Sequence, residues 1–328
     1  RPGIERFLSE LKAETFAKYD AVTIGEAYGV PQQDLHQYIG TDGYFSMIFD
    51  FSYMNIEVEN VDEWYRGRSA WTTSDLRDLL FESQQQVQAI EGYLGNVLEN
   101  HDQPRVLSKL VPNVAYQTAV AAKSLATMYY FLPGVPFIYQ GQELGMKNFE
   151  RRHISEFNDV SSLNNYEMAL RDGCSEAEAL QWLNAKSRDN ARTPMQWTGE
   201  AFGGFSEVEP WLPMGEHRAD INVATEEQDP ASVLNYYRGL AKVRRQPQWH
   251  DVIIDGTFHP LTRLPADVIA YQRRLGDRLI TVLVNLSVQS SRFSLIQVGE
   301  VLTQSGEVTM TGHRVTMAPY TAVVMGIS

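Results

Sequence analysis

The chain has 328 residues, of which 43% are hydrophobic and 21% charged, so it is long enough for a large core and two domains. Its net charge of −13 argues against binding to nucleic acid or to anionic membrane surfaces. A single cysteine, Cys174, excludes an internal disulfide and a cysteine-based zinc site. No apolar stretch approaches the ~18 residues that span a bilayer.

The first 140 residues alternate between helical and strand-like patterns. Helices are indicated by apolar residues at a spacing of three and four, and strands by short apolar runs between glycines and prolines. Nearly continuous apolar strands separated by helices are typical of a parallel sheet covered on both faces. The expected helices cover residues 4–18, 73–90 and 114–131, and the expected strands cover residues 21–25, 45–51, 93–98 and 135–139.

Residues 144–231 form a long polar connection that contains one expected helix, at 175–185. A connection of this length inside a compact domain is usually functional. A further helix is expected over 231–245, and from Trp249 onward the pattern changes to alternating, β-branched runs. These runs predict an antiparallel β-sandwich. We therefore expect domains at 1–247 and 248–328, with sandwich strands at 268–272, 278–286, 308–310 and 321–325.

Carboxyl groups follow the expected strands of the parallel sheet. Glu26 comes after the first strand, and Glu99 and Asp102 come after the third. Active sites collect at the C-terminal ends of parallel strands, and charged groups placed there are costly to desolvate. A solvated loop with an incidental ion pair is the alternative interpretation.

The residue types at these strand ends suit acid/base chemistry on a sugar-like substrate. Glu26 follows apolar residues, which predicts a raised pKa and a protonated general acid. A surface glutamate that caps a loop, and a structural role for His101, are the alternatives. No His, Asp and Glu spacing resembles a metal site and no glycine-rich phosphate loop is present, so neither metal nor cofactor is expected.

Four stretches together resemble the α-amylase superfamily, glycoside hydrolase family 13, in its oligo-1,6-glucosidase and glucan 1,6-α-glucosidase branch. The resemblance implies the C-terminal half of a (β/α)8 barrel, strands 5 to 8, followed by a C-terminal antiparallel β-sandwich. The matching stretches are the strand-5 motif Val22–Glu26, the strand-7 motif Glu99–Arg105, the strand-8 end Tyr139–Met146, and Ser187–Trp197, which is similar to a stretch of that branch.

The resemblance also implies roles for individual residues. Glu26 would be the acid/base and Asp102 the stabiliser of the transition state in a retaining α-glucosidase, which would hydrolyse α-glucosidic bonds, of the α-1,6 type, in short oligosaccharides. His101 would bind sugar hydroxyls and Arg188 the glucose at the non-reducing end. Two further residues, Tyr28 and Arg105, complete the expected substrate-binding set.

One departure from the family pattern concerns the nucleophile. The family carries an aspartate on strand 4 within a Gly-Phe-Arg-x-Asp-like motif, and this sequence contains no such motif. The strand-3 histidine motif and the calcium loop of some members are missing as well. We therefore expect a chain that is inactive alone. We also expect it to associate with another copy or with its missing half through open sheet edges. The expected location is cytoplasmic.

Two other functions remain open. The stretch Glu26–Gly29 is similar to glucan 1,6-α-glucosidases, whereas Gly29–Pro31 is also similar to sucrose isomerases. Those isomerases usually carry asparagine where Gln103 stands, so isomerisation or transglucosylation is the second candidate. A non-catalytic amylase-like subunit is the third. Such subunits commonly lose the acid or the stabiliser, and Glu26 and Asp102 are both present.

Overall fold

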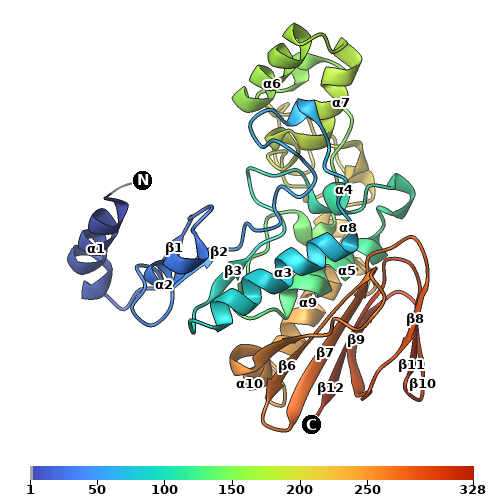
Figure 1. Cartoon of the computed structure of the whole chain (residues 1–328). Helices are drawn as coiled ribbons and strands as arrows, with labels where there is room; N and C mark the ends of the chain where they lie inside the picture. The colour runs from blue at the N-terminus through green and yellow to red at the C-terminus, as the bar shows by residue number, and fades with distance from the viewer. Residues whose placement is uncertain (1–2) are drawn as a thin grey trace.

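An open parallel sheet of four short strands organises the first part of the molecule (Figure 1) in the computed structural model, which describes residues 3–328. The spatial order β1-β2-β3-β4 equals the order in the sequence, and every neighbouring pair is parallel. This is the predicted topology of a partial barrel, with β1 and β4 at its two edges. The strands are β1 (Ile24–Gly25), β2 (Met47–Phe49), β3 (Leu94–Asn96) and β4 (Val135–Pro136).

The strands are much shorter than the apolar runs that predict them. Pairing in the sheet stops within two or three residues, while neighbouring residues such as Val97 and Leu98 stay buried without belonging to a strand. Gly134, before β4, has φ of 100°, and a Cβ atom there would lie 2.1 Å from the carbonyl oxygen of Leu94. Only glycine fits this close approach to β3.

The helices of this part begin at well-defined caps. Helix α3 (Thr73–Gln88) starts with a capping box between Thr72 and Asp75, and α5 (Ala119–Tyr130) starts at Thr118. The N-cap of α3 is thus Thr72. The other α-helices are α1 (Ile4–Glu14), α2 (Leu35–Tyr38), α4 (Val106–Leu110), α6 (Val160–Arg171), α7 (Glu176–Lys186), α8 (Val223–Gln228), α9 (Val233–Arg244) and α10 (His250–Asp255).

Single turns of 3-10 helix connect these elements. The expected helix over 4–18 ends early, and a short turn, η1, follows it. The turns are η1 (Phe16–Lys18), η2 (Gln32–Asp34), η3 (Trp64–Arg66), η4 (Val114–Tyr116), η5 (Gln142–Leu144), η6 (Ile154–Glu156), η7 (Arg188–Asn190) and η8 (Glu216–Ala219).

The N-terminal segment is the most exposed part of the described chain. No residue of α1 is buried, and it lies at the far side of the molecule from the sandwich (Figure 1). Phe7 in this helix is 68% exposed and Val22, just before β1, is 73% exposed. The amphipathic pattern predicts the helix, but its apolar face is only partly covered, with Ile4 and Leu8 half-buried.

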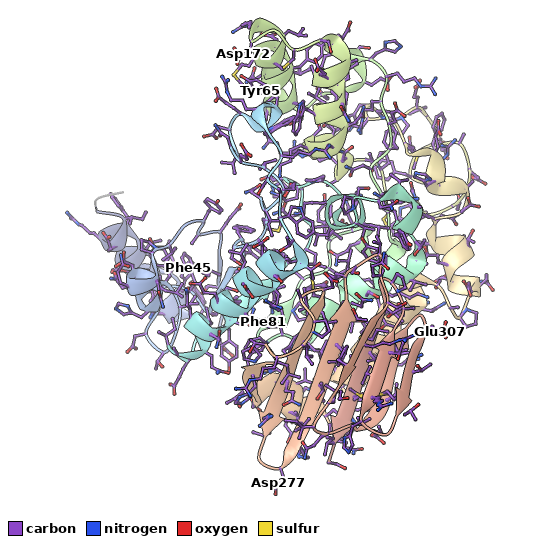
Figure 2. All side chains as sticks on the ribbon, turned by 45° about the vertical axis from the view of Figure 1, so that its right-hand side comes forward. Phe45, Tyr65, Phe81, Asp172, Asp277 and Glu307 are labelled. Carbon is purple, nitrogen blue, oxygen red and sulfur yellow. The ribbon has the colours of Figure 1, made fainter. Side chains whose placement is uncertain are left out.

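Helices α6 and α7 form a separate layer, at the top of Figure 1. Together with the turn η3 they enclose a small core of their own, which contains Trp64, Tyr166 and Leu183. Tyr65 donates a hydrogen bond of 2.8 Å to Asp172 at the edge of this layer (Figure 2). This layer occupies part of the long connection 144–231, in which the sequence predicts α7 but not α6.

The C-terminal part is an antiparallel β-sandwich, as predicted. Its five-stranded sheet has the order β5-β6-β7-β12-β9 and its three-stranded sheet the order β10-β11-β8, with a core of residues such as Val268, Leu283 and Val315 between them. The strands are β5 (Thr257–Pro260), β6 (Val268–Leu275), β7 (Arg278–Asn285), β8 (Ser291–Ser294), β9 (Glu300–Ser305), β10 (Val308–Thr311), β11 (Arg314–Met317) and β12 (Ala322–Ile327).

The five-stranded sheet shares one continuous core with the helices of the barrel half. The Phe81 ring on α3, which Figure 2 labels, lies 5.5 Å from the Phe258 ring on β5. The Tyr271 hydroxyl on β6 donates to the Met128 carbonyl on α5 at 3.0 Å. The expected domain boundary near Pro247 remains a prediction. No helix within residues 3–328 is long and apolar enough to cross a membrane.

Candidate active site

The loop after β3 is anchored by a buried ion pair. Arg105 donates to the Glu99 carboxylate at 3.0 Å, and both side chains are only 1% exposed. The second oxygen of Glu99 accepts a hydrogen bond from the backbone of Val106 at 2.8 Å. Burial raises the pKa of Glu99, and the Arg105 guanidinium opposes that rise. The pair therefore fixes both ends of the loop that carries His101 and Asp102.

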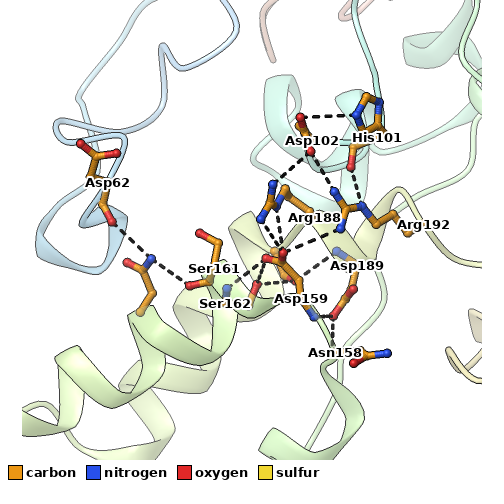
Figure 3. Close-up of polar contacts among 12 residues, drawn as sticks. Asp62, His101, Asp102, Asn158, Asp159, Ser161, Ser162, Arg188, Asp189 and Arg192 are labelled. Carbon is orange, nitrogen blue, oxygen red and sulfur yellow. Dashed lines mark hydrogen bonds and ion pairs between the residues drawn. The ribbon is translucent and has the colours of Figure 1, made fainter.

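Asp102 lies among the side chains of two arginines and a histidine (Figure 3). Its Oδ1 accepts from Arg188 at 3.2 Å and from Arg192 at 2.8 Å, and its Oδ2 lies 3.5 Å from Nε2 of His101. Asn100 orients the turn by accepting a hydrogen bond from the backbone of Asp102 at 2.8 Å. The side chain of Asp102 is 36% exposed, so a ligand can still reach the carboxylate.

Arg188 joins Asp102 to a second, buried carboxylate. Its Nε and Nη2 contact Oδ1 of Asp159 at 2.9 and 2.7 Å, and Asp159 is 1% exposed. Burial raises the pKa of Asp159, but hydrogen bonds from Ser162 and Arg188 outweigh it and hold the pKa below its usual range. Asp159 is also the N-cap of α6. The α6–α7 layer thus holds Arg188 against Asp102.

Glu26 and Tyr28 follow β1 and stay outside this cluster. Both side chains are exposed, and Tyr28, which is 67% exposed, has its ring 6.4 Å from that of Phe51. Because β1, β2 and β3 are parallel, the loops that carry Glu26 and Asp102 both leave the sheet at the C-terminal ends of its strands. The expectation that apolar residues surround Glu26 is wrong. Its side chain is exposed, because β1 is an edge strand of the sheet.

The structure brings together three of the six expected site residues, namely His101, Asp102 and Arg188. The expectation that Arg105 contacts the substrate is not supported, because its side chain is buried. Its guanidinium also donates to the carbonyl of Gln140 at 2.7 Å and lies 5.6 Å from the ring centre of Tyr139. Arg105 therefore positions the loop after β3 rather than facing the site.

The sequence does not predict that Arg192 and Asp159 belong to the cluster. Arg192 contacts Asp102, and its Nε donates to the carbonyl of His101 at 2.8 Å. It stands four residues after Arg188 in the quoted stretch, and that spacing is the only sequence signal for it. Asp159 and Ser162 have the spacing of a helix cap, which predicts a helix start but no link to Asp102.

No group of three or more histidine, cysteine, aspartate or glutamate side chains in the described range 3–328 is arranged to hold a metal ion. The carboxylates of the cluster instead form ion pairs with arginines. Asp102 and Asp159 together face Arg188 and Arg192, so the cluster is balanced in charge.

A parallel half-barrel with carboxylates at its strand ends, followed by an antiparallel sandwich, is the architecture that the resemblance to glycoside hydrolase family 13 predicts. Residues 1–253 match the family described as "Alpha amylase, catalytic domain". The chain belongs to the α-amylase family, glycoside hydrolase family 13.

Among curated proteins the chain is similar to several enzymes that act on glucosides. It is 33% identical over 296 residues to an oligo-1,6-glucosidase of Parageobacillus thermoglucosidasius, which covers 90% of this chain and 51% of that protein. It is 30% identical to a trehalose-6-phosphate hydrolase of Bacillus subtilis, over 98% of this chain and 58% of that protein. The chain spans about half the length of the curated relatives it matches.

Solved structures give the same picture of the fold. The trehalose-6-phosphate hydrolase of Bacillus licheniformis matches with a TM-score of 0.89 and 32% identity, over 99% of this chain and 59% of that chain. The isomaltulose synthase of Klebsiella sp. LX3 matches with a TM-score of 0.90 and 29% identity, over 100% of this chain and 59% of that chain. The predicted partial barrel with a C-terminal β domain is thereby confirmed.

Proposed function

We propose that this chain provides the acid/base and the transition-state stabiliser of a retaining α-glucosidase that acts on short oligosaccharides. The observation that carries the proposal is the cluster around Asp102, which a single chain builds from the loop after β3 and the segment 188–192. The oligo-1,6-glucosidase relatives favour an α-1,6 preference.

The roles of the residues follow from their chemistry. Glu26 protonates the leaving glycosidic oxygen, and Asp102 stabilises the positive charge that develops on the sugar ring. His101 and Arg188 border Asp102 and donate hydrogen bonds to sugar hydroxyls, and the exposed ring of Tyr28 packs against the substrate. Arg192 and the buried Asp159 orient Asp102 and Arg188.

The same scaffold also suits a transglucosylase. The sucrose isomerases among the similar structures favour this second candidate, since isomaltulose synthase matches the whole chain. Water and a second sugar compete for the same glucosyl intermediate, so the two functions differ in the acceptor. In a complete enzyme that contains this chain, product analysis on isomaltose and on sucrose separates them. Glucose from isomaltose supports the hydrolase, and a rearranged disaccharide from sucrose supports the isomerase.

The 328-residue chain by itself should not complete the retaining mechanism, because the sequence lacks the strand-4 aspartate motif of the family. We expect no release of glucose from isomaltose or from an aryl α-glucoside by this chain alone. Supplying the first half of the barrel of a relative as a separate chain should restore hydrolysis. Turnover by the purified chain alone, abolished by Asp102→Asn, would show that another group of this chain serves as nucleophile.

We also infer that the chain associates through its open sheet edge. Among residues 3–328, strand β1 has no neighbouring strand on one side, and Val22 and Ile24 beside that edge are 73% and 39% exposed. An unpaired, apolar strand edge is a template for pairing with another chain. The expected cytoplasmic location stays a prediction.

A further inference from the structure

A cleft of about 1130 Å³ is lined by residues other than those of the candidate active site. Small-molecule sites usually measure about 300–1,000 Å³, so the cleft has room for a short oligosaccharide. Neither Glu26 nor Asp102 lines it. Its walls come from the loop before α3, from the region of α4, from the segments around Asn148 and Asn184, and from the 286–289 turn of the sandwich.

Two indole rings contribute to the walls of this cleft. Trp71 precedes α3 and Trp182 belongs to α7, and both are partly buried. The guanidinium of Arg68 lies 5.3 Å from the ring centre of Trp182. Indoles offer a flat apolar face together with a polar N–H group. The C–H faces of pyranose rings pack on such surfaces, while their hydroxyl groups bond to polar neighbours.

Charges of both signs surround the cleft. Glu57 forms an ion pair of 2.5 Å with Lys186, and the ammonium group of Lys109 is buried close by. The Glu57 carboxylate repels an anion, and the two lysines repel a cation. A neutral ligand with many hydroxyl groups meets neither penalty. The positively charged residues of the walls are Arg68, Lys109, Lys147, Arg152 and Lys186, and the negatively charged residues are Glu57, Glu150, Glu216 and Asp267.

Two lining residues of the cleft, Lys109 and Lys186, also contact the Asp102 loop. Lys109 and Lys186 both donate to the side-chain oxygen of Gln103, each at 3.4 Å. Gln103 follows Asp102 directly, and Lys186 stands two residues before Arg188. The cleft and the candidate active site are therefore separated by one layer of side chains.

We propose that this cleft is a second binding site, for a short neutral gluco-oligosaccharide, separate from the site built on Asp102. Trp71 and Trp182 hold the sugar rings, and the polar floor around Glu57 and Lys186 binds the hydroxyl groups. The binding needs no catalytic step, so it can be tested separately from the proposed glucosidase activity.

The test uses the 328-residue chain labelled with 5-fluorotryptophan, with isomaltotriose as the probe. The six tryptophans give separate fluorine NMR signals, which Trp→Phe variants assign. We expect saturable shifts of the Trp71 and Trp182 signals. The signals of Trp211, which is 73% exposed outside the cleft, and of the buried Trp249 should not move. Absence of saturation at both cleft tryptophans, or equal shifts at all six, would overturn the proposal.

Variants locate the binding. Trp71→Ala should weaken it at least fivefold, while the matched control Trp211→Ala should leave it unchanged. The Trp249 signal reports whether each variant is folded. Asp102→Asn should leave the shifts of Trp71 and Trp182 in place, and their loss in this variant would assign the sugar to the active site instead. Inorganic phosphate is the charged probe, and saturable shifts with phosphate but not with isomaltotriose would contradict a neutral ligand.

Discussion

The two sides of the candidate active site are built very differently. On the β3 side, Asp102 is held by two arginines, by a histidine and, through Arg188, by a buried aspartate. On the β1 side, Glu26 is exposed at an open strand edge. The β3 side is assembled from segments of this chain alone. Within residues 3–328 the β1 side has few buried contacts of its own, so changes on the two sides should have different consequences.

The largest expected effect is on catalysis in a complete enzyme that contains this chain. General acid catalysis contributes about 10²–10⁴-fold, or roughly 3–5 kcal/mol of barrier. Glu26→Gln should therefore slow the cleavage of isomaltose by that factor. It should slow the first step on an activated aryl glucoside far less, because that leaving group departs without protonation.

Asp102→Asn should instead slow both substrates alike, because the role that we propose for Asp102 acts on the charge of the sugar ring. Single-turnover kinetics of both variants on both substrates measures the difference. Equal losses for Glu26→Gln on the two leaving groups would rule out its role as the general acid.

The next effect concerns the stability of the chain. Arg105→Met leaves the buried Glu99 carboxylate without its partner, which should lower the free energy of unfolding by about 3–5 kcal/mol. Glu26→Gln is the matched control on the exposed side, and it should change stability by less than about 0.5 kcal/mol. Urea denaturation gives both values. Similar losses in the two variants would remove the contrast between the two sides.

A smaller effect depends on pH. Burial lowers the pKa of Lys109 to about 8, whereas the pKa of an unfolded lysine is about 10.4. Between these values the unfolded chain binds more protons, so this group makes the folded state more stable as the pH rises, by at most about 3 kcal/mol. Denaturation between pH 7 and 10.5 should show this rise, and Lys109→Met should flatten it. Parallel pH profiles for the two proteins would contradict a buried, shifted lysine.

The smallest effect concerns association. Ile24→Lys places a charge on the open edge of β1 and should weaken self-association about tenfold, or roughly 1.4 kcal/mol. Sedimentation velocity across a concentration series measures it. Thr309→Lys, on an edge strand of the sandwich, is the control and should leave association unchanged. A wild-type chain that stays monomeric throughout the series would show that the β1 edge does not pair.

The sequence predicts most elements of this fold because their patterns are local. The apolar spacing in α3, α5 and α9 and the turns of the sandwich are visible without tertiary contacts. The predicted strands are too long, because burial continues beyond hydrogen-bonded pairing at residues such as Leu98. The sequence pattern does not predict α6, because two of its four buried residues, Ser162 and Asn165, are polar.

The candidate site was less predictable than the fold. Asp102 and His101 were found because they follow a buried strand. The contact of Asp102 with Arg192 joins residues 90 positions apart, and no local pattern encodes that distance. Arg105 illustrates the opposite error, since a charged residue beside the site turned out to be buried in an ion pair. The apolar residues before Glu26 predict a buried strand, and they do not indicate that this strand lies at the edge of the sheet.

The core shared by α3, α5 and the five-stranded sheet makes the sandwich part of the scaffold rather than an exchangeable module. Cutting the chain near Pro247 would leave Phe81 and Met128 facing water on one piece, and Phe258 and Tyr271 on the other. A sandwich grafted from a relative would have to reproduce those partners before the barrel half could fold. Recombination within this family should therefore succeed only at junctions that keep α3, α5 and their sheet together.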